Sequence, residues 1–170
     1  VFGDVMLDRY TFGDSTRISP EAPAPVFKAD RVDAMIGGAG NVARNIVSLG
    51  GEAVLIGAIG ADAAGRELKA AIDAEDGLSA ALAVNAEMRT AVKNRFVAKN
   101  QQMLRVDEED IVDQPDNVVA DMMTALAAAL EDAEVADYRC DTCGGQDARQ
   151  ECWIVKPPGG GPSVSESFNN

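Results

Sequence analysis

Histidine is absent from this chain of 170 residues. Its absence excludes nucleophile pairs of the Ser–His and Cys–His kind, and it excludes zinc sites that depend on imidazole ligands. Any acid–base chemistry must therefore use carboxylates, lysine or tyrosine. Aromatic residues are also scarce, at 5% of the chain, whereas alanine, valine, isoleucine and leucine are abundant. This balance is typical of an α/β protein rather than an all-β protein.

Basic residues are few: 15 Lys and Arg stand against 28 Asp and Glu, which gives a formal net charge of −13. This charge argues against a surface for nucleic acid or anionic membranes, because both need a basic face. No apolar run approaches the roughly 18 residues of a membrane-spanning helix, and no signal peptide precedes the first predicted strand. We expect a cytoplasmic protein without nucleic-acid or membrane partners, comprising one domain or a piece of a larger one.

Three cysteines, Cys140, Cys143 and Cys152, lie in the last fifth of the chain. The first two have the CxxC spacing, but a structural zinc site needs a second pair of ligands, and one further cysteine does not supply it. We interpret the three as incidental thiols and predict no metal site.

Both ends of the sequence look cut or altered. The first strand-like run begins at Val1 without a methionine, as if a buried strand had been entered halfway. From Tyr138 onward the composition changes, and the last fifteen residues are rich in Pro, Gly, Ser and Asn, which is typical of disorder. We therefore expect residues 138–170 to be a divergent tail that is disordered or artefactual.

Strand-like and helix-like segments alternate between these ends. Short apolar runs predict strands, apolar residues at helical spacing predict helices, and turn formers with proline predict loop or edge strand. The predicted strands are 1–7, 54–59, 90–97 and 103–106, the predicted helices are 41–49, 62–72 and 117–130, and 13–26 is loop or edge strand. This order predicts a parallel sheet that carries an inserted hairpin.

A glycine-rich turn over residues 37–40 leads into the helix predicted over 41–49. The GxGxxA pattern over 38–43 satisfies the dinucleotide fingerprint, and Asp62 stands at the spacing of a ribose carboxylate. The fingerprint, however, needs a buried strand directly before the glycines, whereas "KADRVDAM" is interrupted by charges. Asp62 is also explained as the N-cap of the next helix.

The alternative is that the glycines bring backbone N–H groups close to a polyhydroxylated ligand. The side-chain amide of Asn41 could then donate to and accept from sugar hydroxyls. Asparagine is also a common N-cap residue, so Asn41 either binds a ligand or caps its helix.

The glycine turn and two longer stretches carry a resemblance to a known family. Residues 37–43, followed by Gly50 and Gly60, resemble the first motif of the ribokinase/PfkB carbohydrate kinases. The stretches "GDVMLDRYTFGDSTRISPEAPAPV" (3–26) and "TAVKNRFVAKNQQMLRVD" (90–107) resemble one branch, the heptose-7-phosphate kinases, including the kinase half of the bifunctional ADP-heptose synthesis enzyme. The resemblance covers residues 1–137 and implies an α/β fold: a ribokinase-like parallel sheet with flanking helices and a small β-lid, truncated at its C-terminal side.

The resemblance also implies which residues bind the substrate. In the family an aspartate after the first strand binds sugar hydroxyls, and Asp8 stands in that position. Gly37, Gly38 and Asn41 match the glycines and asparagine that line the sugar site. The implied reaction phosphorylates a sugar phosphate, heptose 7-phosphate, at its anomeric hydroxyl in the synthesis of lipopolysaccharide precursors.

Residues 11–36 and 88–106 resemble the family's β-lid, which closes over the sugar and often forms a homodimer contact. A substrate phosphate needs cationic partners, and these segments offer Arg17, Lys93, Arg95 and Arg105. Because arginine suits bidentate phosphate contacts, we prefer Arg17 and Arg105 as the pair. The alternative is that all four are solvated strand residues.

In this family the phosphoryl group comes from ATP with Mg²⁺. A late Asp-Thr-x-Gly-Ala-Gly-Asp motif supplies the carboxylate base and the N–H groups that hold developing charge. Residues 141–147, "DTCGGQD", resemble this motif and make Asp147 a candidate base. Gln146 replaces a glycine, however, and the motif comes too soon for the elements that build the nucleotide site. We therefore leave the catalytic residue unassigned and expect the ATP-binding half to be largely missing.

Three functions stay open at this point. The chain is the sugar-binding part of a heptose-7-phosphate kinase, or it is a non-catalytic remnant that binds sugar phosphate or dimerises through its lid. The third and most distant interpretation is an NAD-dependent oxidoreductase, which rests on the GxGxxA pattern.

Overall fold

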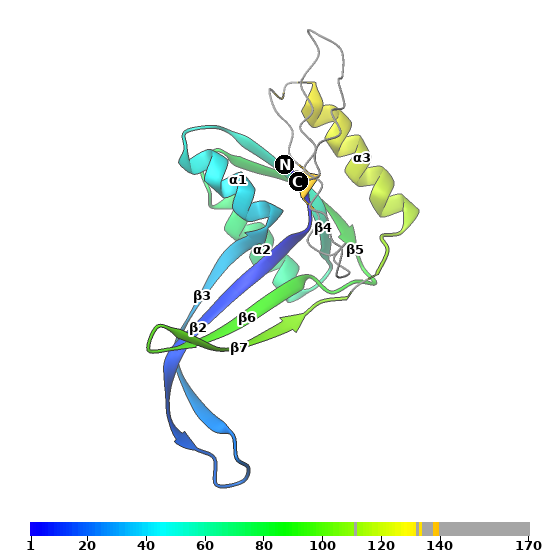
Figure 1. Cartoon of the computed structure of the whole chain (residues 1–170). Helices are drawn as coiled ribbons and strands as arrows, with labels where there is room; N and C mark the ends of the chain where they lie inside the picture. The colour runs from blue at the N-terminus through cyan, green and yellow to red at the C-terminus, as the bar shows by residue number, and fades with distance from the viewer. Residues whose placement is uncertain (111, 132, 134–137, 140–170) are drawn as a thin grey trace, which may run out of the picture.

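Two β-sheets make up much of the part of the chain described by the computed structural model, which comprises residues 1–110, 112–131, 133 and 138–139 (Figure 1). The core sheet consists of β1 (Phe2–Gly3), β4 (Ala53–Gly60), β5 (Leu78–Asn85) and β8 (Tyr138–Arg139). Its spatial order is β5–β4–β1–β8, and its neighbouring strands are parallel. The lid sheet consists of β2 (Val5–Ile18), β3 (Pro25–Gly38), β6 (Ala91–Ala98) and β7 (Gln101–Glu108), in the order β3–β2–β6–β7.

Helices cover both faces of the core sheet. They are α1 (Ala39–Ser48), α2 (Ala63–Asp73) and α3 (Asp116–Leu130). Figure 1 shows α1 and α2 on one side of β4 and β5 and α3 on the other. Leu55 on β4 and Leu68 and Ile72 on α2 are fully buried, and burial of each such side chain contributes roughly 1.5–3 kcal/mol. Among the helices of the described residues, none is long and apolar enough to cross a membrane.

The lid sheet consists of two hairpins that lie side by side. Within each hairpin the strands are antiparallel, and the parallel pairing of β2 with β6 joins the hairpins. Lys99 and Asn100 form the turn between β6 and β7 with φ angles of 49° and 67°, the left-handed region that a type I′ hairpin turn requires. In Figure 1 the outer ends of β2 and β3 extend past β6 and β7, away from the helices.

Of the two alternatives expected over 13–26, strand holds on both sides of the turn and loop holds only for 19–24. β2 continues to Ile18 and β3 begins at Pro25, so the turn covers only 19–24. Pro20 and Pro23 fall in this turn, and Pro25 opens β3, an edge strand, where a missing N–H is tolerated. The prolines therefore mark the turn of a long hairpin rather than a loop.

The expected strand over 1–7 is split between the two sheets. Residues 2–3 belong to the core sheet, whereas Val5 already begins β2 of the lid sheet. Between them the carbonyl oxygen of Asp4 accepts a hydrogen bond from the N–H of Ala39, at 2.8 Å. This bond ties the junction of the two sheets to the start of α1.

The other expected elements are confirmed to within a few residues, as is the parallel sheet with an inserted hairpin. β5 was not predicted, because its segment "LSAALAVN" is rich in alanine, a residue depleted in strands. β5 forms because it pairs with β4 along its whole length, from Leu78 opposite Ala53 to Asn85 opposite Gly60. Tertiary pairing outweighs local preference here.

Candidate functional site

One face of the lid sheet gathers charged side chains from three strands, and we call it the polar face. The register places Asp8 of β2 opposite Lys93 of β6, and Tyr10 opposite Arg95. Across the next pairing Arg95 stands opposite Arg105 of β7. Because registered neighbours lie on the same face of a sheet, these five side chains share one surface. Residues on the other face, beginning with Leu7 on β2, pack into the core.

Asp8 and Arg95 form an ion pair at the centre of the polar face. Arg95 Nη1 lies 2.5 Å from Asp8 Oδ1, and the two side chains are only 17% and 19% exposed. The Arg95 guanidinium also lies 5.1 Å from the centre of the Tyr10 ring, a cation–π distance. Burial opposes the charge of Arg95, but the hydrogen bond from Arg95 to Asp8 and the negative charge of Asp8 raise the pKa of Arg95 above the usual arginine value.

Gly37 leaves room for the Asp8 carboxylate. A Cβ atom at Gly37 would lie 2.6 Å from Asp8 Oδ2, which no side chain tolerates without displacing the carboxylate. The next residue, Gly38, has a φ of 60° and stands at the N-cap position of α1. The two glycines therefore serve different purposes: the first clears space beside a carboxylate, and the second provides the left-handed turn from β3 into α1.

Asn41 is exposed in the first turn of α1, and the structure excludes the N-cap role that was open for it. The N-cap residue is Gly38, which makes no side-chain capping hydrogen bond. The helix begins at Ala39, two residues before the predicted start. The Asn41 amide is therefore not used as a helix cap.

Arg17 and Arg105, the pair preferred as phosphate ligands, lie far apart in the structure. Arg105 is on the polar face, where it forms an ion pair with Asp107 at 2.8 Å. Arg17 lies near the far end of β2, nine residues from Asp8, which is roughly 30 Å along a strand. Within one chain these two arginines do not meet. Arg95, which was a lid cation but not a preferred one, is the arginine that contacts Asp8.

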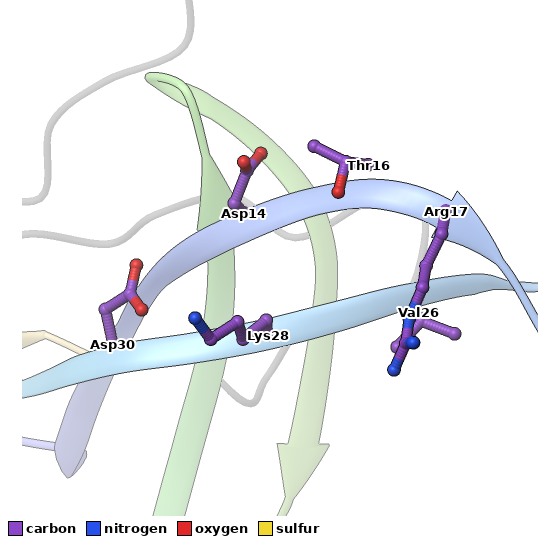
Figure 2. Close-up of a pocket in the computed structure, with 6 residues that line it drawn as sticks. All are labelled: Asp14, Thr16, Arg17, Val26, Lys28 and Asp30. Carbon is purple, nitrogen blue, oxygen red and sulfur yellow. The ribbon is translucent and has the colours of Figure 1, made fainter.

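Arg17 instead lines a groove on the outer part of the β2–β3 hairpin. The groove has a volume of about 470 Å³ and is lined by Asp14, Thr16, Arg17, Val26, Lys28 and Asp30. Figure 2 shows Arg17 reaching from β2 across Val26 on the neighbouring strand. The groove is therefore distinct from the surface around Asp8.

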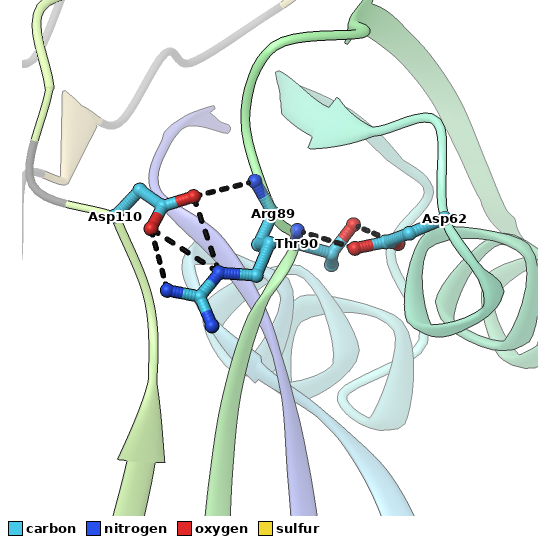
Figure 3. A network of polar contacts seen from close by, with 4 residues as sticks. All are labelled: Asp62, Arg89, Thr90 and Asp110. Atoms are coloured by element: carbon cyan, nitrogen blue, oxygen red, sulfur yellow. Dashed lines mark hydrogen bonds and ion pairs between the residues drawn. The ribbon is translucent and has the colours of Figure 1, made fainter.

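Asp62 lies at the base of the lid sheet. It is the N-cap residue of α2, which was one of its two interpretations; the other was a ribose carboxylate. Its Oδ1 accepts a hydrogen bond from the Gly65 N–H at 2.7 Å, and Oδ2 accepts one from the Thr90 N–H at 2.9 Å (Figure 3). Burial alone would raise the pKa of the Asp62 carboxyl, but the hydrogen bonds from Gly65 and Thr90 outweigh burial and lower this pKa below the ordinary 3.8.

The dinucleotide interpretation does not fit this geometry. The strand before the glycines, β3, is antiparallel to β2 and exposed along residues 28–32, whereas the fingerprint needs a buried parallel strand there. Asp62, the candidate ribose carboxylate, is occupied as a cap. The GxGxxA pattern thus reflects a strand-to-helix turn built from small residues and does not indicate a dinucleotide site.

Two further expectations concern parts of the chain outside the described residues: Asp147 with the "DTCGGQD" segment, and the three cysteines. Within the described residues, no group of three or more Asp, Glu, Cys or His side chains could hold a metal ion.

The central place of Arg95 and the role of Thr90 were not predicted from the sequence. Arg95 was one of four lid cations with nothing to rank it above the others, because only the register of β6 against β2 brings it to Asp8. Thr90 gave no signal beyond its position at the start of a predicted strand. The structure shows it 2% exposed, with its hydroxyl bonded to Asp62.

Comparison with known families gives a match to the model described as pfkB family carbohydrate kinase, over residues 1–136. The chain is 51% identical over 141 residues to the bifunctional protein HldE of Caulobacter sp. (strain K31), covering 81% of this chain and 28% of that protein. It is 44% identical over 128 residues to D-beta-D-heptose 7-phosphate kinase of Bordetella bronchiseptica, covering 75% and 40%. The chain thus spans well under half the length of these relatives.

Solved structures share the fold at low sequence identity. Phosphofructokinase-2 from Escherichia coli, in complex with fructose-6-phosphate, superposes with a TM-score of 0.57 at 22% identity, covering 82% of this chain and 43% of that one. A carbohydrate kinase from Agrobacterium tumefaciens gives a TM-score of 0.58 at 19% identity, with the same coverage. These likenesses concern the arrangement of sheets and helices alone.

Proposed function

The chain belongs to the pfkB family of carbohydrate kinases, and on this premise we propose that the polar face of its lid sheet binds a sugar phosphate of the heptose 7-phosphate class. The observation that carries the proposal is the Asp8–Arg95 pair beside Gly37. A carboxylate that accepts hydrogen bonds and a guanidinium that binds anions lie side by side. A sugar phosphate offers both a hydroxyl donor and an anionic acceptor.

Asp8 is the proposed acceptor for the sugar hydroxyls. Gly37 keeps the neighbouring space free, so a hydroxyl can approach Asp8 Oδ2. Arg95 Nη1 contacts the other carboxylate oxygen, Oδ1, at 2.5 Å. Gly38 and Asn41, which follow along the chain, extend the proposed sugar site toward the start of α1. An amide that both donates and accepts suits a ring of hydroxyls.

Lys93, Arg95 and Arg105 are the proposed partners of the phosphate. They share the polar face, and arginine offers the paired N–H groups that fit phosphate oxygens. In a chain with a formal net charge of −13, such a cluster of cations marks a place for an anion. Arg17 is too far along β2 to join them in the same chain.

A homodimer formed through the lid is part of the proposal. The face opposite the polar face exposes apolar side chains in the outer part of the sheet: Val32 is 59% exposed, Leu104 55% and Val106 41%. Exposed apolar side chains on a sheet are stabilised when a second surface covers them. A second copy of the same sheet is the partner that the family resemblance favours.

ATP and Mg²⁺ are the cofactors that membership of this family implies. The described residues do not fit a metal site, because they contain no cluster of three or more candidate ligands. We therefore assign these residues to the sugar side of the reaction.

Two outcomes of sugar binding are possible, and they are separable. If the chain is a kinase, heptose 7-phosphate and ATP–Mg²⁺ together give a bisphosphate that ³¹P NMR detects, and Asp147→Asn abolishes it. If the chain only binds sugar phosphate, calorimetry detects binding and no product forms.

Isothermal titration calorimetry with heptose 7-phosphate tests the proposed site, with the unphosphorylated heptose as a second ligand. We expect binding of the phosphate ester, a weakening of at least tenfold without the phosphate, and a similar loss in Asp8→Asn. Asp121→Asn, the same change on an exposed position of α3, is the matched control and should bind normally. Equal binding by wild type and Asp8→Asn would contradict the assignment of Asp8.

A further inference from the structure

Tyr10 and Phe12 form a row of aromatic rings on the polar face, next to Asp8 on the same strand. Their ring centres lie 6.3 Å apart and their planes differ by 18°, so the two rings are stacked. The parallel register places Tyr10 opposite Arg95 of β6, and the Arg95 guanidinium lies 5.1 Å from the centre of the Tyr10 ring. A cation at this distance is attracted by the face of an aromatic ring. The row therefore begins against a cation of the proposed phosphate site.

Two contacts restrict the Arg95 side chain before any ligand binds. Its Nη1 donates to Asp8 Oδ1 at 2.5 Å, and the Tyr10 ring lies against the guanidinium. The side chain is 17% exposed, compared with 49% for Arg105 on the neighbouring strand. A side chain that is already fixed loses less rotamer entropy when a ligand binds. Arg95 is therefore better prepared than Arg105 to receive an anion.

Part of the Arg95 guanidinium keeps its capacity to donate hydrogen bonds. Nη1 donates to Asp8 and, at 3.4 Å, to the Lys93 carbonyl oxygen, whereas Nε and Nη2 contact no acceptor of the described residues. Neither nitrogen is sealed from solvent, because no buried side-chain nitrogen or oxygen in the described part of the chain lacks a partner. Nε and Nη2 form one edge of the planar guanidinium, and such an edge binds two oxygens of a phosphate in parallel. Arg95 thus offers a free edge to an oxyanion while Nη1 stays on Asp8.

We propose that Tyr10 is a positioning residue of the sugar-phosphate site, which holds Arg95 so that the Nε–Nη2 edge is presented to the phosphate. One hydrogen bond at Nη1 does not fix the plane of the guanidinium, because the group can turn about that bond. The face of the Tyr10 ring restricts this rotation, and the stacked Phe12 ring supports Tyr10. The inference rests on the proposed function for the identity of the ligand, whereas the order of the Arg95 side chain is a property of the free protein.

NMR measures the contact between Tyr10 and Arg95 without any ligand. Tyr10→Leu removes the aromatic face and keeps an apolar side chain, so we expect the Arg95 Nε–H proton to exchange with water about fivefold faster. Tyr10→Phe keeps the ring and should match wild type. Phe27→Leu removes a ring that contacts Phe96 on the opposite face of the lid sheet, and it should leave the Arg95 signal unchanged.

A second substitution guards against loss of the fold. Tyr10→Ile introduces a side chain that is favoured in strands, and it replaces Tyr10→Leu if that variant does not fold. Circular dichroism establishes that each variant is folded before the exchange is measured. An unchanged exchange rate of the Arg95 Nε–H proton in the folded Tyr10 variant would overturn the proposal.

Calorimetry tests the consequence for ligand binding. If wild type binds heptose 7-phosphate, Tyr10→Leu should bind it about tenfold more weakly, whereas Tyr10→Phe and Phe27→Leu should bind it normally. Affinity for the unphosphorylated heptose should not change in Tyr10→Leu, because Arg95 is assigned to the phosphate. An equal loss for both sugars, or a loss in Tyr10→Phe as large as that in Tyr10→Leu, would overturn the positioning role.

A double-mutant cycle distinguishes positioning from direct contact with the ligand. If Tyr10 acts through Arg95, then Tyr10→Leu should weaken binding of heptose 7-phosphate by less than about twofold when Arg95→Gln is already present. A tenfold loss in that background would mean that Tyr10 contacts the ligand itself, and it would overturn the proposal. Failure of wild type to bind heptose 7-phosphate would contradict the proposed function, while the NMR measurement would still decide whether Tyr10 holds Arg95.

Discussion

Asp8 and Arg95 are 87 positions apart in the sequence, yet their side chains meet at 2.5 Å on the lid sheet. The parallel pairing of β2 with β6 creates this contact, because it places Asp8 opposite Lys93 and brings Arg95 to the next position on the same face. The two opposite charges compensate each other where both side chains are largely buried. Any change at one residue therefore alters the state of the other.

Arg95→Gln should both destabilise the protein and weaken sugar-phosphate binding. Removing the guanidinium leaves the Asp8 carboxylate largely enclosed without its partner, which we expect to cost about 1–3 kcal/mol in the free energy of unfolding. Urea denaturation followed by circular dichroism measures this loss. Arg31→Gln is the control, because the Arg31–Asp33 pair is exposed and should contribute no more than about 1 kcal/mol. Equal effects of the two changes would contradict a special role for Arg95.

Gly37→Ala should impair the site more than it impairs the fold. The added methyl group would lie 2.6 Å from Asp8 Oδ2, so the carboxylate must move, and we expect affinity for heptose 7-phosphate to fall at least tenfold. Gly50→Ala is a matched change: its Cβ atom meets nothing within 4 Å, but its φ of 87° strains alanine by about 1–2 kcal/mol. Calorimetry should find normal binding in Gly50→Ala, and a parallel loss there would argue against the steric explanation.

The contribution of Asp62 to stability should depend on pH in acid. Its pKa is lowered in the folded protein, so the stabilisation it provides is complete above the ordinary value of 3.8 and is lost as the pH falls through the folded-state pKa. The difference in unfolding free energy between wild type and Asp62→Asn should be constant near neutrality and shrink below about pH 4. Denaturant midpoints at several pH values, with Asp121→Asn as control, measure it. A difference that grows in acid would have the wrong sign.

The turn between β6 and β7 should favour glycine at position 100. Asn100 has a φ of 67°, which asparagine tolerates and glycine adopts freely. Asn100→Gly should therefore keep or slightly raise the melting temperature, whereas Asn100→Val should cost about 1–2 kcal/mol because β-branched residues are strained in this region. Differential scanning calorimetry ranks the three proteins, and equal stability of Val and Gly at this position would contradict the turn geometry.

Leu104→Glu should disrupt the proposed dimer. Leu104 is 55% exposed on the face of the lid sheet opposite the polar face. Glutamate at this position should therefore leave the fold intact but destabilise an apolar interface. Sedimentation velocity should show wild type as a dimer and the variant as a monomer. The matched change Val119→Glu on exposed α3 should leave the dimer intact. A monomeric wild type at micromolar concentration would contradict the dimer.

Much of the local structure could be predicted from the sequence. Apolar periodicity identified the three helices of the described residues, Asp62 was a predicted cap, and the strands predicted over 90–97 and 103–106 placed a turn between them. Signals of this kind depend on neighbours within one or two turns of the chain. β5 was not predicted, and the extension of β2 was left open between loop and edge strand, because these residues form strands only against partners.

The candidate site divides in the same way. The sequence by itself determined a set of candidates, Asp8, Gly37, Gly38 and Asn41, because the family resemblance relates them by their positions along the chain, and their shared role in binding a sugar stays a prediction. Only the tertiary structure decided among the cations. Arg95 contacts Asp8, and Lys93 and Arg105 lie on the same face of the sheet. Arg17 lies far from them, near the other end of β2. The physical reason is strand register, which fixes which distant side chains share a face and which no pattern within a single strand encodes.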